Sequence, residues 1–248
     1  MEGVLKIKGS VLKKCTDKRT TSVVIPDGVT EIGGYAFDKC ESLSAVEIPN
    51  SVTEIRFSAF GDCKSLKSVV IPSSVMKIDD YAFSGCESLE SVVIPSSVSE
   101  IGEFVFKDCN INSLSHPLLT IKGGLAIEDN RVLYCASQNP SIAVPEGVSE
   151  IGKYAFHNCK YLKLVVIPLS VTKIEYCAFS GCTSLESVVI PSSVTEIEIM
   201  AFWNCTSLSS VEFGGTATQW KAVKKKDALW KHGIPATCVK CTDGEAEL

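Results

Sequence analysis

The stretch SLESVVIPSSV occurs twice in this chain, at residues 88–98 and again at residues 184–194. Its Ile-Pro pair belongs to a longer pattern, because an Ile-Pro or Val-Pro pair recurs every 23 residues within two blocks. The prolines of these pairs are Pro26, Pro49, Pro72, Pro95, Pro145, Pro168 and Pro191. An active site gives no reason for such repetition, so the pattern indicates a tandem repeat with one interruption.

Each repeat carries the same apolar residues at fixed distances from its proline. In the repeat that follows Pro72 these residues are Val75, Ile78, Phe83 and Cys86. A leucine then leads into the next strand with the spacing L-x-x-V-x-I. A period of 23 residues with this spacing is typical of leucine-rich repeats.

The short β-branched run before each proline predicts a strand, which ends where the proline cannot donate a hydrogen bond. The segment Y-A-F-x-x-C predicts a short helical turn on the opposite side of the repeat. Burial in one repeat contributes roughly 10–20 kcal/mol, whereas ordering its residues costs about 35 kcal/mol. A single repeat is therefore unstable, and stacking is required. The expected fold is an α/β repeat: a curved leucine-rich-repeat solenoid with one short parallel strand per repeat, capped at both ends.

The expected domain organisation has three parts. Residues 1–22 form an N-terminal capping segment, residues 23–213 form the solenoid, and residues 214–248 form a C-terminal cap. An irregular insert at 110–144, which can include a hairpin, interrupts the solenoid. Part of this insert resembles the start of the chain, with Cys135 in the place of Cys15. Two separate solenoids joined at the insert are the alternative.

The C-terminal cap should look different from the repeats, because an open solenoid end exposes its core. A short helix is expected to begin near Thr216 or Thr218. Four apolar side chains are available to cover the last repeat: Trp220, Val223, Leu229 and Trp230.

Composition excludes several classes of protein. Apolar residues make up 45% of the chain and charged residues 21%, which is typical of a globular protein. The net charge of −5 gives no basic footprint for nucleic acid. No run of about 18 apolar residues predicts a membrane span. The first residues, MEGVLKIKGSVLKKC, lack the pattern of a signal peptide.

The repeat IPSSVSEIGEFVFKDC at residues 94–109 and its six siblings resemble the BspA-like class of bacterial leucine-rich repeats. The terminal pattern GTATQW…CTDG is similar to the closing segment of that class. The resemblance implies a protein of the cell surface, or a secreted one, with a role in adhesion and a host or matrix protein as partner. Because neither a signal peptide nor a wall anchor is visible in the sequence, a cytoplasmic location stays open.

The chain has twelve cysteines, and seven of them form one column, fourteen residues after each proline. Neighbouring column members would lie within disulfide range, but we interpret them as small apolar residues with a weak S–H donor. Cys238 and Cys241 form a C-x-x-C motif for which only His232 is a nearby further ligand. A zinc site needs four ligands, so a cap pair, free or bridged, is preferred. We predict no metal site and no cofactor.

No residue of the chain is predicted to be catalytic. His157 lies two residues before Cys159, but its register position is variable, which favours a solvated surface histidine. Nucleophile-elbow, phosphate-loop and zinc-protease motifs are missing from the sequence. The run Lys224–Lys226 is interpreted as a solvated helix face that an acidic partner could use.

Binding is expected on the outward side chains of the strands, which lie four and two residues before each proline. These rows are mostly serine and valine, and a contiguous exposed apolar area marks an interaction site. Three bulky residues, Tyr161, Leu164 and Leu169, replace small polar ones in one repeat and are candidate anchors. The predicted partner-binding residues are Val70, Val93, Tyr161, Leu164, Val166, Leu169 and Val189.

We therefore predict a non-enzymatic scaffold for protein–protein interaction. The alternative is a self-assembling structural module whose strand side chains bind a second copy, which makes a homo-oligomer possible. Carbohydrate binding would need exposed aromatic side chains and carboxylates on one face, and the strand rows offer few.

Overall fold

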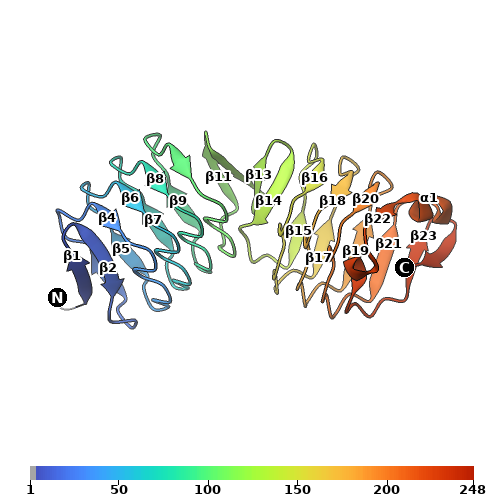
Figure 1. Cartoon of the computed structure of the whole chain (residues 1–248), viewed down its shortest axis with the longest axis horizontal. Helices are drawn as coiled ribbons and strands as arrows, with labels where there is room; N and C mark the ends of the chain where they lie inside the picture. Colours follow the sequence, from blue (N-terminus) through green and yellow to red (C-terminus); the bar gives the residue numbers. More distant parts are fainter. Residues whose placement is uncertain (1–3) are drawn as a thin grey trace. The chain divides into compact units, whose positions relative to one another are not determined.

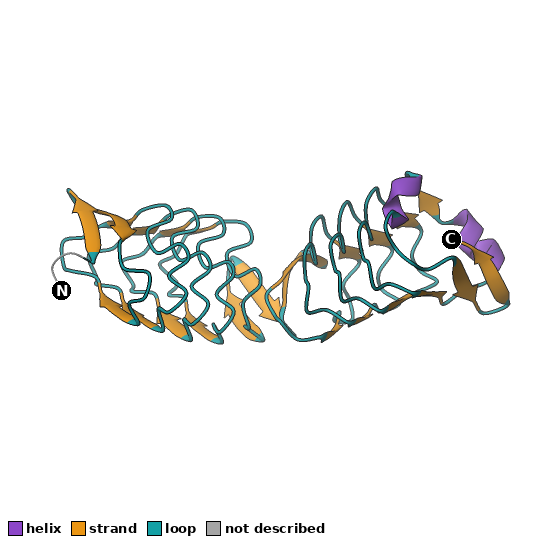
Figure 2. Cartoon of the chain, turned by 90° about the horizontal axis from the view of Figure 1, so that it is seen from below, coloured by secondary structure: helices purple, strands orange, loops and turns teal. Residues whose placement is uncertain are grey.

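The computed structural model describes residues 4–248, and the chain forms two compact units, one ending at Ile121 and the other beginning at Lys122. In each unit the chain coils so that successive repeats add parallel strands (Figure 1). Within the described residues, helix is confined to the C-terminal part of the chain (Figure 2). The predicted leucine-rich-repeat solenoid is confirmed.

Two kinds of strand alternate along the first unit. The strands that precede the prolines are β3 (Ser22–Val24), β5 (Ala45–Glu47), β7 (Ser68–Val70) and β9 (Ser91–Val93). Two-residue strands follow the prolines, namely β4 (Glu31–Ile32), β6 (Glu54–Ile55), β8 (Lys77–Ile78) and β10 (Glu100–Ile101). The unit begins with β1 (Leu5–Lys8) and β2 (Val11–Cys15), and β11 (Ser113–His116) follows the last repeat. The next strand, β12 (Leu119–Lys122), ends at the first residue of the second unit.

The second unit repeats this alternation. It begins with β13 (Leu125–Glu128) and β14 (Arg131–Cys135). The longer strands are β15 (Ser141–Ala143), β17 (Leu164–Val166), β19 (Ser187–Ile190) and β21 (Ser210–Phe213). The two-residue strands are β16 (Glu150–Ile151), β18 (Lys173–Ile174), β20 (Glu196–Ile197) and β22 (Lys224–Lys225). The unit ends with α1 (Ala217–Ala222), the 3₁₀ turn η1 (Ala228–Lys231), β23 (Cys238–Cys241) and β24 (Gly244–Glu247).

Equivalent strands of successive repeats pair in parallel, one full repeat apart. In the first unit β1-β2-β4-β6-β8-β10 form one sheet, while β3 pairs with β5 and β7 with β9. In the second unit β13-β14-β16-β18-β20-β22 are consecutive neighbours, and β15-β17-β19-β21-β23-β24 form a further sheet. Ile32 lies opposite Ile55, and Val165 opposite Val188. The predicted strand of each repeat is therefore present, and the two-residue strand that follows each proline is an addition that was not predicted.

The predicted helical turn in the Y-A-F-x-x-C segment is wrong, because this segment forms hydrogen bonds to the next repeat. Every second backbone N–H donates to a carbonyl oxygen one repeat on, as in Tyr35 to Phe57, Phe37 to Ala59 and Lys39 to Gly61 (2.7–3.0 Å). A continuous helix would bond these N–H groups internally. The alternation requires left-handed backbone at two positions, where Tyr35 has φ 60° and Lys39 has φ 56°.

The core consists of side-chain columns that continue from repeat to repeat. Phe37, Phe60 and Phe83 stack in the first unit with centroids 4.9 and 5.0 Å apart. Phe156, Phe179 and Phe202 stack in the second unit at 4.8 and 5.0 Å. All six rings are fully buried. Because each ring covers the face of its neighbour, removal of one repeat would expose the ring face of the next.

The C-terminal cap closes the phenylalanine column of the second unit. The N–H of Phe202 donates to the carbonyl of Trp230 (2.8 Å), and the two rings meet edge to face at 6.1 Å. The N-cap of α1 is Thr216, whose hydroxyl accepts from the N–H of Gln219, while the Gln219 side chain accepts from the N–H of Thr216. The predicted helix start is therefore confirmed.

Three of the four predicted cap side chains are buried: Trp220, Val223 and Trp230. The prediction for Leu229 is wrong, since 39% of it is exposed. Leu229 and Trp230 are consecutive in η1, and successive side chains of such a turn point in different directions. Trp230 takes the inward position.

The run Lys224–Lys226 is not the solvated helix face that was predicted, because α1 ends at Ala222. Lys224 and Lys225 form β22, which pairs with β20. The Lys225 ammonium lies 4.1 Å from the centroid of the Trp220 ring, and burial lowers its pKa. Lys226 forms ion pairs with glutamates on and beside β20.

The start of the chain and the start of the second unit form the same hairpin. Leu5 lies opposite Cys15, and Leu125 lies opposite Cys135, each with a register shift after the second residue. This hairpin gives a structural reason for the resemblance seen in the sequence within 110–144. The predicted domain boundaries stay a prediction.

Candidate binding surface

The outward side chains of β3, β5, β7 and β9 form the first strand face. On β7, Val69 is buried while Ser68 and Val70 point outward, as strand alternation requires. Val70 lies opposite Val93 of β9, and 67% and 56% of these two residues are exposed. The first strand face is therefore mostly valine beside serine, and Glu47 of β5 interrupts the valine row.

The outward side chains of β15, β17, β19 and β21 form the second strand face, which is bulkier. Leu164 and Val166 are both exposed on β17, and Val166 lies opposite Val189 of β19. Leu164 lies between Ser141 and Ser187 in the neighbouring strands. Its side chain therefore stands above two smaller neighbours.

Tyr161 and Leu169 flank β17, three residues before and three residues after its ends, and 48% and 70% of them are exposed. Complete burial of a side chain of this size contributes about 1.5–3 kcal/mol. Large apolar side chains that remain in water beside one another are the usual anchors of an interface. All seven predicted binding residues are exposed, two in the first unit and five in the second.

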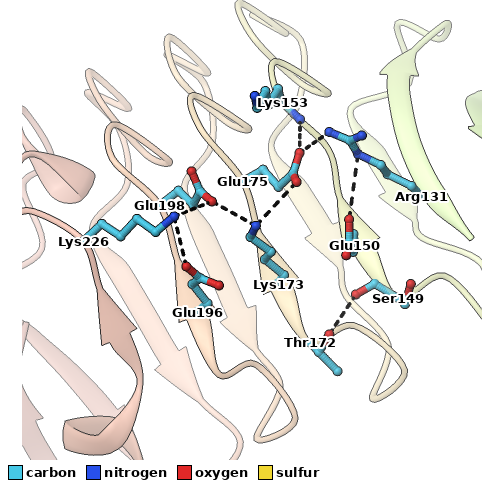
Figure 3. A network of polar contacts seen from close by, with 10 residues as sticks. All are labelled: Arg131, Ser149, Glu150, Lys153, Thr172, Lys173, Glu175, Glu196, Glu198 and Lys226. Atoms are coloured by element: carbon cyan, nitrogen blue, oxygen red, sulfur yellow. Dashed lines mark hydrogen bonds and ion pairs between the residues drawn. The ribbon is translucent and has the colours of Figure 1, made fainter.

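The two-residue strands of the second unit carry charges that neutralise one another (Figure 3). Lys173 pairs with Glu175 (3.6 Å) and Glu198 (2.9 Å), and Glu175 also accepts from Arg131. Lys226 completes the network through Glu198 (2.9 Å). The pKa of Lys173 is raised because Glu198 accepts a hydrogen bond from its ammonium group. We refer to this network as the second ion-pair ladder.

A first ion-pair ladder lies on the equivalent strands of the first unit. Arg56 pairs with Glu54 (2.8 Å), Glu31 (3.3 Å) and Asp79 (3.7 Å). Lys77 joins Asp79 (3.6 Å) to Glu100 (2.9 Å). Because these ion pairs connect residues of neighbouring repeats, the two ladders hold the repeats together. The strand faces, in contrast, keep apolar area exposed to water.

The cysteine column behaves as the small-residue interpretation predicts. Five of the seven thiols donate to the carbonyl oxygen of a phenylalanine in the preceding repeat, as in Cys86 to Phe60 (3.1 Å) and Cys182 to Phe156 (2.9 Å). Burial raises the pKa of the Cys86 thiol well above its usual value. The thiols are therefore structural S–H donors in the core.

Among residues 4–248 no three or more histidine, cysteine or acidic side chains are grouped so that they could hold a metal ion. Cys238 and Cys241 lie three residues apart on β23, and alternation directs such residues to opposite sides of a strand. Both thiols are free and half-buried. His157 is also half-buried, with its ring 3.0 Å from the Asn158 amide and edge-on to Tyr154.

One exposed feature was not predicted: aromatic side chains from successive repeats touch one another outside the core. They lie on the turn segment, eight or nine residues after the prolines. In the first unit they are Tyr35, Phe57, Tyr81 and Phe104. The signal for this feature in the sequence is the recurrence of Tyr or Phe eight or nine residues after the proline.

Comparisons with known proteins place this geometry among bacterial repeat proteins. A leucine-rich repeat protein from Eubacterium ventriosum is 22% identical with a TM-score of 0.61, over 93% of this chain and 71% of that one. One from Bacteroides ovatus is 27% identical with a TM-score of 0.49, over 81% of this chain. This chain spans only 58% of the length of the latter protein.

A leucine rich cell surface protein from Faecalibacterium prausnitzii is 21% identical with a TM-score of 0.39, over 92% of this chain and 97% of that one. Curated proteins give no match. Among residues 4–248 no helix has the length and apolar character needed to cross a membrane. The model of the BspA type leucine rich repeat region matches residues 6–123 and 126–229 in six copies, and the chain therefore belongs to the BspA-type leucine-rich repeat family.

Proposed function

We propose that this protein is a non-enzymatic scaffold that binds a protein ligand through its strand faces. The observation that carries the proposal is the exposed cluster around β17, where Leu164, Val166 and Val189 adjoin and Tyr161 and Leu169 flank them. These side chains form an apolar surface on a rigid, hydrogen-bonded sheet, so binding requires little ordering of the scaffold. Val70 and Val93 offer a smaller apolar contact in the first unit.

The proposed setting is recognition at the cell surface, with a host or matrix protein as the ligand. This setting rests on membership of the family, whose members are often surface proteins of host-associated bacteria. An adhesin-like role also agrees with a scaffold whose internal charges are paired, since the ligand then contacts mainly apolar side chains.

The test is binding of the full chain to a panel of purified extracellular-matrix and serum proteins, measured by surface plasmon resonance. In the variant Leu164→Glu/Leu169→Glu we expect affinity for any ligand to fall about 30-fold, the effect of losing roughly 2 kcal/mol at an interface anchor. The matched control is Thr172→Glu/Thr195→Glu. It adds the same charge to exposed residues beside β18 and β20 and should bind normally.

Equal binding by the wild type and the Leu164→Glu/Leu169→Glu variant would remove the second strand face from consideration. Light scattering of the same samples tests the alternative function, in which the strand faces bind a second copy. Concentration-dependent association that both leucine replacements abolish would favour the self-assembling module.

A further inference from the structure

An aromatic row runs along the turns of the first unit, and it comprises Tyr35, Phe57, Tyr81 and Phe104. Neighbouring ring centroids lie 5.3, 5.6 and 5.2 Å apart. Tyr35 is 56% exposed, Phe57 is exposed, and Tyr81 and Phe104 are half-buried. The aromatic row is separate from the strand face, because its residues belong to the turn segment that follows the two-residue strands.

Steric preference does not explain aromatic residues at these positions. Tyr35, Tyr81 and Phe104 have φ between 54° and 60°, a left-handed conformation that is unfavourable for bulky side chains. The second left-handed position of each repeat carries residues such as Asp62 and Gly85, which suit that conformation. Bulky side chains at strained positions are a reason to look for a function.

Two carboxylates without ion pairs lie beside the last two rings of the aromatic row. Asp80 precedes Tyr81 and Glu103 precedes Phe104, and both acidic residues are exposed. Among residues 4–248 neither carboxylate forms an ion pair, in contrast to the neighbouring Asp79, which pairs with Arg56 and Lys77.

Hydrogen bonds to the backbone fix the Asp80 carboxylate and the main chain of Glu103. The N–H of Glu103 donates to a carboxylate oxygen of Asp80 (2.8 Å), and the N–H of Tyr81 donates to the carbonyl of Glu103 (2.9 Å). One oxygen of Asp80 is therefore occupied, while its other oxygen and the Glu103 carboxylate remain as acceptors. Because the Asp80 carboxylate is already held, its pairing with a cation carries little ordering cost.

We propose that the aromatic row and the acidic pair Asp80–Glu103 form a second binding surface, which takes a polypeptide segment that alternates basic and apolar side chains. Arginine or lysine pairs with the two carboxylates and lays its methylene stem over Tyr81 and Phe104. Apolar side chains of the same segment cover Phe57 and Tyr35. Charge complementarity selects a basic segment, since the acidic pair has no compensating cation of its own.

The equivalent turns of the second unit have a different character, which makes them an internal control. Tyr154 and Tyr176 also touch there, with centroids 5.4 Å apart. The residue before Tyr154 is Lys153, and the residue before Tyr176 is Glu175, which belongs to the second ion-pair ladder. A basic segment therefore finds no unpaired carboxylate at this position and should bind to the first unit alone.

The experiment uses the full chain and a short fluorescein-labelled peptide of alternating arginine and leucine, with fluorescence anisotropy as the readout. The variant Asp80→Asn/Glu103→Gln keeps the shape of the site and removes its charge, and we expect its affinity to fall about tenfold or more. Wild-type binding should also weaken as salt is added. The matched control Asp27→Asn/Glu90→Gln removes two exposed carboxylates elsewhere in the first unit and should bind as the wild type does.

A second variant, Tyr81→Ser/Phe104→Ser, tests the rings. Serine occupies the same left-handed position at Ser58, so the fold accommodates it there, and we expect a further loss of affinity. The proposal is overturned if Asp80→Asn/Glu103→Gln binds the peptide as the wild type does, or if a glutamate–leucine peptide binds equally well. A ligand of the strand face should bind both variants normally, so this surface and the proposed function can fail independently.

Discussion

In both units the thiol of a buried cysteine donates to a phenylalanine carbonyl, at 3.1 Å for Cys86 and 2.9 Å for Cys182, and the phenylalanine rings stack at about 5 Å. The outside of the two units is different. Where β7 presents Ser68 and Val70, β17 presents Leu164 and Val166. The interior repeats because each residue packs against its own equivalent, whereas the exterior has no such constraint and can acquire binding surfaces.

The largest expected effect tests whether the two interiors are equivalent. Replacement of the central ring of either column, Phe60→Ala or Phe179→Ala, should cost about 3–5 kcal/mol of unfolding free energy, because each ring loses contacts on both faces. Chemical denaturation followed by circular dichroism measures the loss, and hydrogen exchange identifies the unit that opens. A difference of more than about 2 kcal/mol between the variants would show that the columns are not equivalent.

The exposed ring next to the column provides the control. Phe57 lies on the same turn as Phe60, but it is exposed, and its ring contacts those of its row neighbours Tyr35 and Tyr81. Phe57→Ala should therefore cost about 1 kcal/mol or less. A cost as large as that of Phe60→Ala would mean that the aromatic row is part of the core.

A histidine interrupts the regular interior of the first unit. His116 precedes Pro117 as Ile71 precedes Pro72, and only 7% of the residue is exposed. Its Nδ1 accepts from the N–H of Leu118 (3.2 Å), while Nε2 has no hydrogen-bond partner in the described chain. His116→Ile should raise the unfolding free energy by about 1 kcal/mol, since a buried unpaired polar group is removed.

The N–H of Leu118 can bond to water in this variant, because Leu118 is itself exposed. Ile167→His places the same group at the equivalent position of the second unit, where it should destabilise by about 2 kcal/mol. A gain of unfolding free energy in His116→Ile and a loss in Ile167→His would show that this interior position prefers an apolar side chain in both units. A loss of stability in His116→Ile would instead show that the histidine has a partner that the interior requires.

Much of the interior follows from sequence alone, because every core column is visible as a residue type at a constant distance from proline. The turn segment was harder to predict, since Y-A-F-x-x-C has helical propensity that is overridden by hydrogen bonds between repeats. One of its two left-handed positions was detectable in Asn, Asp and Gly residues. The other was not, because Tyr35 and Phe104 contradict the steric rule.

The surfaces were predictable only in part. Strand alternation identified Val70 and Leu164 as outward, and both are exposed. The ion-pair ladders were missed, although acidic and basic residues alternate from strand to strand in the second unit, where Lys173 lies between Glu150 and Glu196. Pairing of such residues depends on the neighbouring repeat lying in register, which becomes clear only when the parallel strands are in place.

The two ion-pair ladders differ in burial, and we expect this difference to change how much stability each ladder contributes. Lys173 pairs with Glu175 and Glu198, whose side chains are 9% and 15% exposed, whereas the partners of Arg56 are 24–33% exposed. Lys173→Gln leaves two largely buried carboxylates with less compensation and should cost about 1–2 kcal/mol. Arg56→Gln should cost about 0.5 kcal/mol. Chemical denaturation at low and at high salt measures the unfolding free energy that each variant loses. Equal losses in Lys173→Gln and Arg56→Gln would contradict the idea that burial makes the second ladder stronger.

The smallest expected effect is a difference in acid response between the units. Burial acts to raise the pKa of Glu198, but hydrogen bonds from Lys226 and Lys173 outweigh it, so the pKa lies below its usual value. Its stabilisation is present at neutral pH and is lost as the pH falls through this lowered pKa. Burial and the charge of Asp38 raise the pKa of Asp62. The ionised Asp62 carboxylate therefore lowers the unfolding free energy at neutral pH, and this loss of stability disappears as the pH falls below the ordinary pKa of aspartate.

Two conservative replacements test whether the ionised Glu198 stabilises the fold and the ionised Asp62 destabilises it. Asp62→Asn copies the second unit, which has Asn158 at the same left-handed position, and should stabilise by a few tenths of a kcal/mol at neutral pH. Glu198→Gln should destabilise at neutral pH, and both differences from wild type should shrink as the pH falls into the acid range and the two carboxylates become protonated. Unfolding midpoints measured across this pH range provide the test. If Asp62→Asn is destabilising at neutral pH, the Asp62 carboxylate must have a favourable contact that outweighs its burial, and the two units would then respond to acid with the same sign.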